Sequence, residues 1–266
     1  MSRQRGGVLI VRMAAVAVAA LVLAGCDIVV ESLNSQASDE WTRRYTLAPG
    51  GQVEILNVNG AIEVRSSEGT TVEVRAVRTA HGASEQTAKE TLGRVEIKET
   101  ATPEQIRIET NTPRGLGALS RVTVEYHVVV PRTAKLRLRT DNGSLKMSGV
   151  GGAVKLETTN GSITAEQLGG AVDAGTTNGS VKIDVDTVAK DGIQIETTNG
   201  SVELRLPSSS KADLVGRCVN GSVHASNLNV ESGGETTRRR LEGRLNGGGP
   251  RVELQTTNGS VRFVGK

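Results

Sequence analysis

A short motif, Thr-Thr-Asn-Gly-Ser followed by Val or Ile, recurs through the C-terminal half of the chain. Its Asn-Gly-Ser triplet begins at residues Asn142, Asn160, Asn178, Asn199, Asn220 and Asn258, so successive subtraction gives spacings of 18, 18, 21, 21 and 38 residues. A looser copy, Asn59-Gly60-Ala61, lies far upstream. Internal repeats of about this length are typical of a chain that stacks one small structural unit on the next.

Apolar residues alternate with polar ones on both sides of each triplet. Around Asn160, the alternate positions are Val154, Leu156 and Thr158 before the triplet and Ile163 after it. The other copies repeat this set, with Val172, Ala174, Thr176 and Val181; Ile193, Ile195, Thr197 and Val202; and Val252, Leu254, Thr256 and Val261. Intervening positions are mostly charged or polar. This period of two predicts half-buried β-strands, with the listed residues facing inward.

Each Asn-Gly pair predicts a tight bend between two strands, because glycine adopts positive φ without a Cβ clash. The predicted bend residues are Asn142, Gly143, Asn160, Gly161, Asn178, Gly179, Asn199, Gly200, Asn220, Gly221, Asn258 and Gly259. A two-residue type I′ hairpin is one interpretation. The near-constant spacing favours stacked coils instead, in which inward asparagines would form a hydrogen-bonded ladder.

The predicted fold is therefore all-β, a right-handed parallel β-helix with coils of roughly 18–21 residues, as the repeat spacing indicates. Residues 132–266 form the regular solenoid, which ends at Phe263 to Lys266. Residues 41–131 form a less regular β region that continues it and caps its other end. Within that region, Ser84 to Leu92 predicts a short helix with Ser84 as N-cap and Gly93 as stop. Residues 112–120 read as a loop, and Val122 to Pro131 as the longest strand.

The N-terminus has the features of a secretory signal. Three arginines precede an apolar run that ends in Leu23-Ala24-Gly25-Cys26, and such a run is too short for a membrane span. Leu-Ala-Gly-Cys resembles the bacterial lipobox. The resemblance implies a signal peptide over 1–25, cleavage between Gly25 and Cys26, a lipid on Cys26, and a membrane-anchored protein of the bacterial cell envelope. Residues 26–40 would then be the lipidated cysteine and a tether.

Removal of the signal leaves no excess of positive charge. Residues 1–25 hold three of the 32 basic residues and none of the 29 acidic ones, so 32 − 3 leaves 29 of each. Nucleic-acid binding therefore lacks its electrostatic support. Aromatic residues make up only 2% of the chain, which also disfavours stacking platforms for bases.

No motif indicates catalysis or a cofactor. The three histidines are far apart and none has metal-ligand spacing. Phosphate loops and nucleophile elbows are absent from the sequence. Asp184 and Asp186 share a strand face, where a solvated face is favoured over a cation site. Cys218 replaces the inward threonine of its repeat and is expected to be a buried small hydrophobe. Arg238, Arg239 and Arg240 are a weak candidate for polyanion or lipid-headgroup binding.

The stretch from Leu136 carries a family resemblance. Leu-Arg-Leu-Arg-Thr-Asp-Asn-Gly-Ser, then Gly-Val-Gly-Gly and serial Thr-Thr-Asn-Gly-Ser, resembles the bacterial putative-adhesin family of β-strand-repeat proteins, a domain of unknown function. The resemblance covers about residues 45–266. It implies a right-handed β-helix and brings no catalytic residues.

Three functions are compatible with these observations. The first is a non-enzymatic, lipid-anchored scaffold or interaction surface, adhesin-like, for an envelope protein or wall polymer. The second is a polysaccharide-active β-helix enzyme, a lyase or hydrolase whose acids and bases would come together from neighbouring coils. The third is a partner subunit in envelope-stress signalling.

Overall fold

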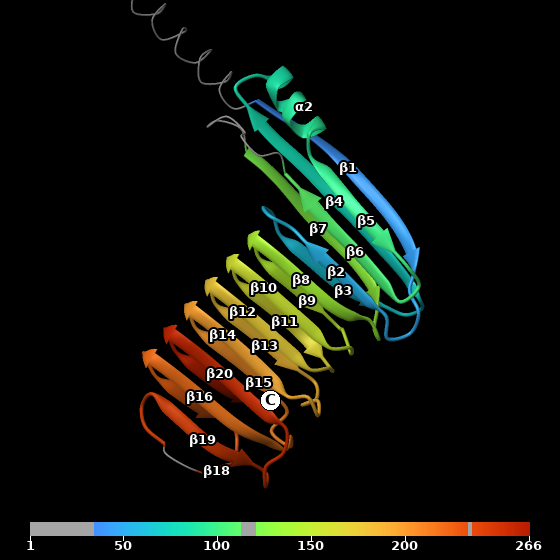
Figure 1. Ribbon diagram of the computed structural model, residues 1–266. Coiled ribbons are helices and arrows are strands. Elements are labelled where there is room, and N and C mark those ends of the chain that lie inside the picture. Colours follow the sequence, from blue (N-terminus) through green and yellow to red (C-terminus); the bar gives the residue numbers. More distant parts are fainter. Residues whose placement is uncertain (1–34, 113–120, 234–235) are drawn as a thin grey trace, which may run out of the picture.

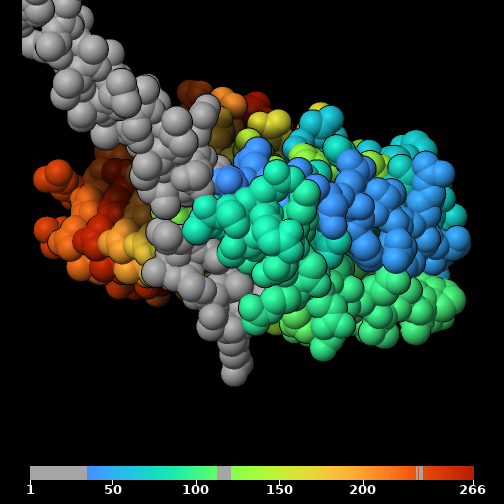
Figure 2. All heavy atoms as spheres, turned by 90° about the horizontal axis from the view of Figure 1, so that it is seen from above, coloured from blue at the N-terminus to red at the C-terminus, as the bar shows by residue number. Residues whose placement is uncertain are grey.

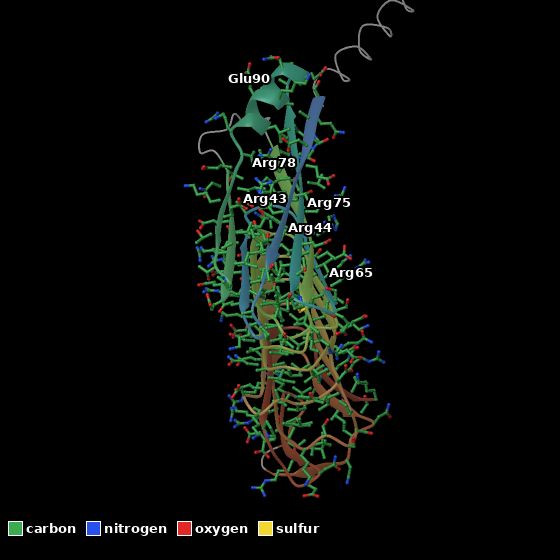
Figure 3. The ribbon with its side chains drawn as sticks, turned by 90° about the vertical axis from the view of Figure 1, so that its right-hand side faces the viewer. Arg43, Arg44, Arg65, Arg75, Arg78 and Glu90 are labelled. Carbon is green, nitrogen blue, oxygen red and sulfur yellow. The ribbon has the colours of Figure 1, made fainter. Side chains whose placement is uncertain are left out.

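The computed structural model describes residues 35–112, 121–233 and 236–266, which form two β-sheets packed face to face and one helix (Figure 1; Figure 3). Sheet A contains, in spatial order, β1 (Ser35–Thr46), β4 (Thr71–Gly82), β7 (Arg121–Pro131), β3 (Ile62–Ser67), β9 (Leu145–Ser148), β11 (Ile163–Leu168), β13 (Val181–Val185), β15 (Val202–Leu206), β21 (Val261–Gly265) and β17 (Val223–Ser226). Sheet B contains β18 (Val230–Ser232), β19 (Arg240–Leu245), β16 (Ala212–Asn220), β20 (Arg251–Asn258), β14 (Ile193–Asn199), β12 (Val172–Asn178), β10 (Val154–Asn160), β8 (Lys135–Asn142), β2 (Gln52–Leu56), β6 (Gln105–Asn111) and β5 (Glu96–Ala101).

Each Asn-Gly-Ser bend carries the chain from sheet B to sheet A. β10, for example, pairs in parallel with β8 and β12 in sheet B, while β11, which follows its bend, pairs with β9 and β13 in sheet A. The two arms of a bend therefore belong to different sheets, and the type I′ hairpin interpretation is wrong. The all-β prediction with stacked, solenoid-like coils is confirmed. Both sheets are mixed, because antiparallel pairs occur toward their ends.

The core lies between the two sheets and consists of the inward positions predicted from the alternation. Val154 is in register with Val172, which in turn is in register with Ile193, and all three are almost completely buried. Burying an aliphatic side chain of this size contributes about 1.5–3 kcal/mol. Repetition over successive coils thus builds one continuous apolar column instead of a separate core for each repeat.

The inward threonines connect neighbouring coils through hydrogen bonds. Thr158 Oγ1 donates to the carbonyl of Gly143 at 3.0 Å, and Thr176 Oγ1 donates to that of Gly161 at 2.9 Å. Thr140, Thr197 and Thr256 make the equivalent bond to a bend glycine at 2.8–3.1 Å. A buried hydroxyl needs such a partner, so the periodic threonine is compatible with the apolar core.

The bend asparagines form the expected ladder, but it lies on the outside of the molecule. Each Nδ2 donates to the Oδ1 of the neighbouring rung at 2.8–2.9 Å, in the spatial order Asn59, Asn142, Asn160, Asn178, Asn199, Asn258 and Asn220. The prediction of inward asparagines is wrong, because the strand ends at the bend and the six triplet asparagines are exposed there.

The bend glycines are required mainly by close stacking. A Cβ on Gly161 or Gly179 would lie 2.0 Å from the carbonyl oxygen of the bend glycine in the preceding coil. No bend asparagine among the described residues has positive φ. At each bend the backbones of neighbouring coils therefore stack directly on one another. Any side chain at the glycine position would push two coils apart.

The N-terminal end is formed by the long strands β1, β4 and β7 together with the helix α2 (Glu85–Gly93). Ser84 caps the helix by accepting a hydrogen bond from the Thr87 amide at 3.2 Å, so the predicted helix is confirmed. Strand β1 begins at Ser35, so residues 35–40 are strand and not tether. β1 and β4 each have 12 residues and β7 has 11, which corrects the expectation for the longest strand. The predicted loop at 112–120 lies almost wholly outside the described residues.

The C-terminal coils are not stacked in sequence order. β20 lies between β14 and β16 in sheet B, and β21 lies between β15 and β17 in sheet A. The last repeat, around Asn258, is thus inserted before the repeat around Asn220. The outer end is formed by β16, β17 and the antiparallel strands β18 and β19. The expectation of an abrupt end at Phe263 to Lys266 is therefore wrong.

Candidate interaction surface

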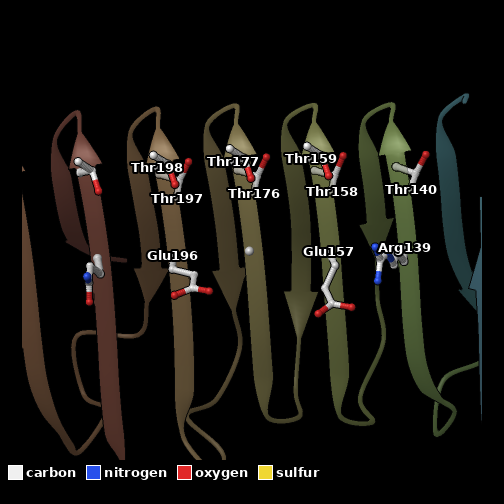
Figure 4. Close-up of a pocket in the computed structure, with 13 residues that line it drawn as sticks. Arg139, Thr140, Glu157, Thr158, Thr159, Thr176, Thr177, Glu196, Thr197 and Thr198 are labelled. Carbon is white, nitrogen blue, oxygen red and sulfur yellow. The ribbon is translucent and has the colours of Figure 1, made fainter. Parts of the chain in front are cut away.

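A shallow hollow of about 400 Å³ lies on the outer face of sheet B, across β8, β10, β12, β14 and β20 (Figure 4). Its floor is made by Gly175, which is in register with Glu157 on one side and Glu196 on the other. Among the outward positions in this row of sheet B, only Gly175 lacks a side chain, so the outer face is indented there. The alternation of the sequence shows that Gly175 faces outward, but only the register shows which side chains flank it.

The two carboxylates flank the indentation differently. Glu196 leans over Gly175, since its Cγ lies 3.5 Å from the position of an added Cβ. Glu157 is paired weakly, with Lys155 Nζ at 3.5 Å and Arg137 at 3.9 Å, and its Oε2 is shielded from solvent without a hydrogen bond. Residues two strands apart in a sheet are separated by about 10 Å. The hollow is therefore polar and open, with a carboxylate on each side of Gly175 and the cationic Arg139 beside Glu157 (Figure 4).

A column of outward threonines borders the hollow. Thr159, Thr177, Thr198 and Thr257 are the second threonines of the Thr-Thr pairs and line it, and Figure 4 shows the first three in one row above Glu157 and Glu196. Adjacent rungs stand about 4.8 Å apart. The Asn ladder runs along the next position. Hydroxyl and amide groups are thus presented in two regular rows. Since the first threonine of each Thr-Thr pair faces inward, the second must face outward, so the sequence could have predicted this column. The sequence interpretation missed it.

The outer face of sheet A is different near the N-terminus, where arginines and carboxylates neutralise one another (Figure 3). Arg75 pairs with Glu40 at 2.7 Å, Arg44 with Glu73 at 2.9 Å and Arg65 with Glu63 at 2.6 Å. Hydrogen bonding from Arg75 lowers the pKa of Glu40, and that from Arg65 lowers the pKa of Glu63. A cavity of about 710 Å³ lies over these strands, but its charged groups are already paired.

The predicted arginine triplet does not form a single site. Arg238 and Arg239 are exposed, and their backbone carbonyls accept hydrogen bonds from the Val223 and Cys218 amides, both at 2.9 Å. These carbonyls take the place that a further coil would occupy at the outer end. Arg240 instead pairs with Glu242 at 2.6 Å. The backbone of the triplet therefore caps the outer end of the stack, and only Arg238 and Arg239 present exposed cationic side chains.

The other singled-out residues have structural surroundings. Cys218 is buried, as predicted, and burial raises the pKa of its thiol. Asp184 and Asp186 both pair with Lys266, the latter at 3.2 Å. The described residues contain no group of three or more histidine, cysteine or acidic side chains placed to hold a metal ion. Gly25 and Cys26 lie outside the described residues. In the part of the chain that the structure describes, no helix is long and apolar enough to span a membrane.

Comparisons with solved structures return proteins of low sequence identity. A putative cell adhesion protein from Clostridium sporogenes is 16% identical, with a TM-score of 0.47 over 86% of this chain and 100% of its own. A putative adhesin from Bacteroides fragilis is 9% identical, with a TM-score of 0.41 over 86% and 97%. A putative lipid binding protein from Parabacteroides distasonis is 9% identical, with a TM-score of 0.36 over 85% and 96%.

No curated protein matches the sequence significantly. The family model described as Toastrack DUF4097 matches residues 52–263, which is most of the chain and includes every described coil. The resemblance to a family of β-strand-repeat proteins of unknown function is thereby confirmed. The chain belongs to the Toastrack DUF4097 family.

Proposed function

We propose that this protein is a non-enzymatic, lipid-anchored scaffold of the bacterial cell envelope that presents the outer face of sheet B, adhesin-like, to a protein or wall polymer. The observation that carries the proposal is the register: Thr159, Thr177, Thr198 and Thr257 are held in one column by coils that are hydrogen-bonded on both sides. Such a surface is rigid before it meets a partner, which reduces the entropy cost of binding.

The shape of the molecule supports a spacer role. Sheet A has ten strands, and nine intervals of about 4.8 Å give a length of roughly 43 Å. The N-terminal strand β1 and the outer coil β16–β17 lie at opposite ends (Figure 1; Figure 2). A lipid on Cys26 would anchor the β1 end and direct the later coils away from the membrane. The right-handed winding with coils of roughly 18–21 residues is part of this proposal.

The anchor is tested by comparing the full chain with Cys26→Ser in a bacterial host. Metabolic labelling with a palmitate analogue should mark the wild type only, and the wild type should fractionate with membranes while the variant is released. Label on the variant, or a wild type that is soluble without label, would refute lipid anchoring at Cys26.

The interaction surface is tested with matched substitutions on the two faces. Purified wild-type protein, Thr177→Lys on sheet B and Thr164→Lys on sheet A would be used to capture envelope proteins and wall fragments. Both positions are outward threonines: Thr177 follows the inward Thr176 on β12, and Thr164 lies between the inward Ile163 and Ala165 on β11. We expect Thr177→Lys to lose a partner that Thr164→Lys retains. Equal capture by all three proteins, or none by the wild type, would argue against this surface.

The hollow also favours a second candidate, a polysaccharide-active enzyme. Glu157 and Glu196 are carboxylates on either side of an open indentation, and glycoside hydrolysis uses two carboxyl groups flanking the scissile bond. Digestion of purified wall polysaccharides with the wild type, Glu157→Gln and Glu196→Gln would distinguish the two functions. Cleavage by the wild type that both variants lose would replace the scaffold proposal.

A further inference from the structure

The strand order at the C-terminal end defines a slot that is filled by the last segment of the chain. The coil β20–β21, residues 251–265, lies between coil β14–β15 and coil β16–β17 in both sheets. Its bend is bonded on both sides: Asn258 O accepts from Gly200 N on the β14 side, and Gly259 N donates to Asn220 O on the β16 side, each at 2.9 Å. The Asn ladder also passes through it, from Asn199 to Asn258 to Asn220, at 2.8 Å in both steps.

This segment can leave the slot without unthreading the chain. Residues 246–250, Asn-Gly-Gly-Gly-Pro, connect it to the preceding strands, so the chain after this connection can move as one unit. These five residues pass from β19 on one side of β16 to β20 on its other side. Asn246, Gly247 and Gly248 all have positive φ, from 51° to 89°. A glycine-rich connection of this kind has the backbone freedom to reverse or extend, which makes it a hinge. To open, it must release the hydrogen bonds that Asn246 Nδ2 donates to the carbonyls of Ser208 at 2.9 Å and Ser210 at 2.8 Å.

The slot selects the C-terminal coil over its neighbour. If the coil left, β16–β17 could meet β14–β15 in the same register, because both coils carry matching bends. However, β16 has Gly216 where β20 has Leu254, and β17 has Ala225 where β21 has Phe263. Leu254 and Phe263 are fully buried, so the direct contact would leave a large void. Deleting side chains of this size from a core is strongly destabilising.

We propose that two copies of this chain exchange their C-terminal coils, so that β20–β21 of each copy fills the slot between β14–β15 and β16–β17 of the other. Every contact that the coil makes in the slot is retained in the exchanged dimer, and only the hinge at 246–250 changes conformation. Exchange of an identical element is a route to a closed, twofold-symmetric dimer. The occupant is a second copy because the slot's shape is complementary to the chain's own Phe263 and Leu254.

Two added cysteines can distinguish exchanged from unexchanged molecules. Glu196 on β14 is the direct register partner of Gln255 on β20, and both are exposed. Neighbouring strands are about 4.8 Å apart, within the Cα separation that a disulfide accepts. Two differently tagged full-length copies, both with Cys218→Ser, would be co-expressed, one carrying Glu196→Cys and the other Gln255→Cys. Each would also be co-expressed with a copy lacking an added cysteine, to account for links through Cys26.

Exchange predicts a disulfide-linked dimer with both tags after mild oxidation, in the mixed pair and not in the single-cysteine mixtures. A chain carrying both substitutions should form the same bond, between copies where the coils are exchanged and internally in any unexchanged molecule, which checks the register. Insertion of Gly-Ser-Gly-Ser after Gly248 should reduce the linked dimer and keep the internal bond, since a longer hinge favours closure within one copy. An internal bond without any mixed dimer would overturn the proposal. Failure of the doubly substituted chain to form any bond, internal or between copies, would also overturn it, because the slot itself would then be wrong.

Discussion

Phe263 lies against Gly216, at the junction of the inserted coil with the outer one. A Cβ built on Gly216 would be 2.8 Å from Cε2 of the phenylalanine and 2.6 Å from Cγ1 of Val223. The glycine therefore provides the space that the fully buried ring occupies. These two residues are 47 positions apart in sequence, as 263 − 216 shows, and they account for the reversed order of the last two coils.

Gly216→Val should destabilise the protein by about 1–3 kcal/mol, because overpacking forces the ring or the strand to move. Gly175→Ala is the matched control, since its added Cβ would make only ordinary contacts at 3.5 Å and beyond. Urea denaturation measures both changes. If Phe263→Leu combined with Gly216→Val is no more stable than the sum of the single variants predicts, the two residues are not coupled.

Gly200→Val should disrupt the stack of bends. A Cβ there would lie 2.0 Å from the carbonyl oxygen of Gly179, and φ is +157°. Backbone cannot yield as a side chain does, so we expect a loss of at least about 3 kcal/mol, at the severe end for single substitutions. Gly93→Ala, whose Cβ would meet nothing within 4 Å, serves as control. A melting temperature for Gly200→Val equal to that of Gly93→Ala would contradict the close stacking.

Ile195→Asp tests the inward parity. Ile195 is completely buried between Ala174 and Leu254, and a carboxylate there would have no partner. The expected loss is about 3–5 kcal/mol. Thr198→Asp, an exposed position on the same strand, should change the free energy of unfolding by no more than about 0.5 kcal/mol. Circular dichroism during thermal unfolding provides the comparison, and similar midpoints would show that the parity is wrong.

Thr176→Val tests the inward hydroxyls. The change keeps the shape of the side chain and removes the hydrogen bond to Gly161 at 2.9 Å, which leaves a carbonyl without its partner. About 1–2 kcal/mol should be lost. The adjacent Thr177→Val is the natural control, because Thr177 is exposed and its substitution should be close to neutral. Equal stability of the two variants would show that the threonine ladder contributes nothing.

Acid should weaken the β1 end of the molecule. The pKa values of Glu40 and Glu63 are lowered from their ordinary 4.5 by hydrogen bonds from Arg75 and Arg65. Since the unfolded chain binds these protons more readily, the stabilisation is fully present above pH 4.5 and is lost as pH falls through the lowered values. Hydrogen exchange of β1 and β4 between pH 6 and pH 3 would follow this loss. Arg75→Gln should make the loss of exchange protection with falling pH shallower. An unchanged pH profile would contradict the assignment of this loss to the Arg75–Glu40 pair.

The sequence by itself determined the repeating unit. Alternation of residues such as Val154, Leu156 and Ile163 specifies half-buried strands, because side chains on a strand point to opposite faces in turn. The family, the helix after Ser84 and the buried Cys218 were equally accessible, since each depends on residues close together in the chain. These features are local, and local patterns encode them.

Only the tertiary structure decided which coils are neighbours. Because the bends match, every coil can stack on any other in the same register. The repeat itself therefore does not determine whether the coil with Asn220 or the coil with Asn258 lies beside the coil with Asn199. The choice is made by volume, because Phe263 needs the space that Gly216 leaves. The same holds for the hollow at Gly175, since its flanking carboxylates come from two other strands. Long-range packing determines both features, because the residues that form them come together only when the coils stack.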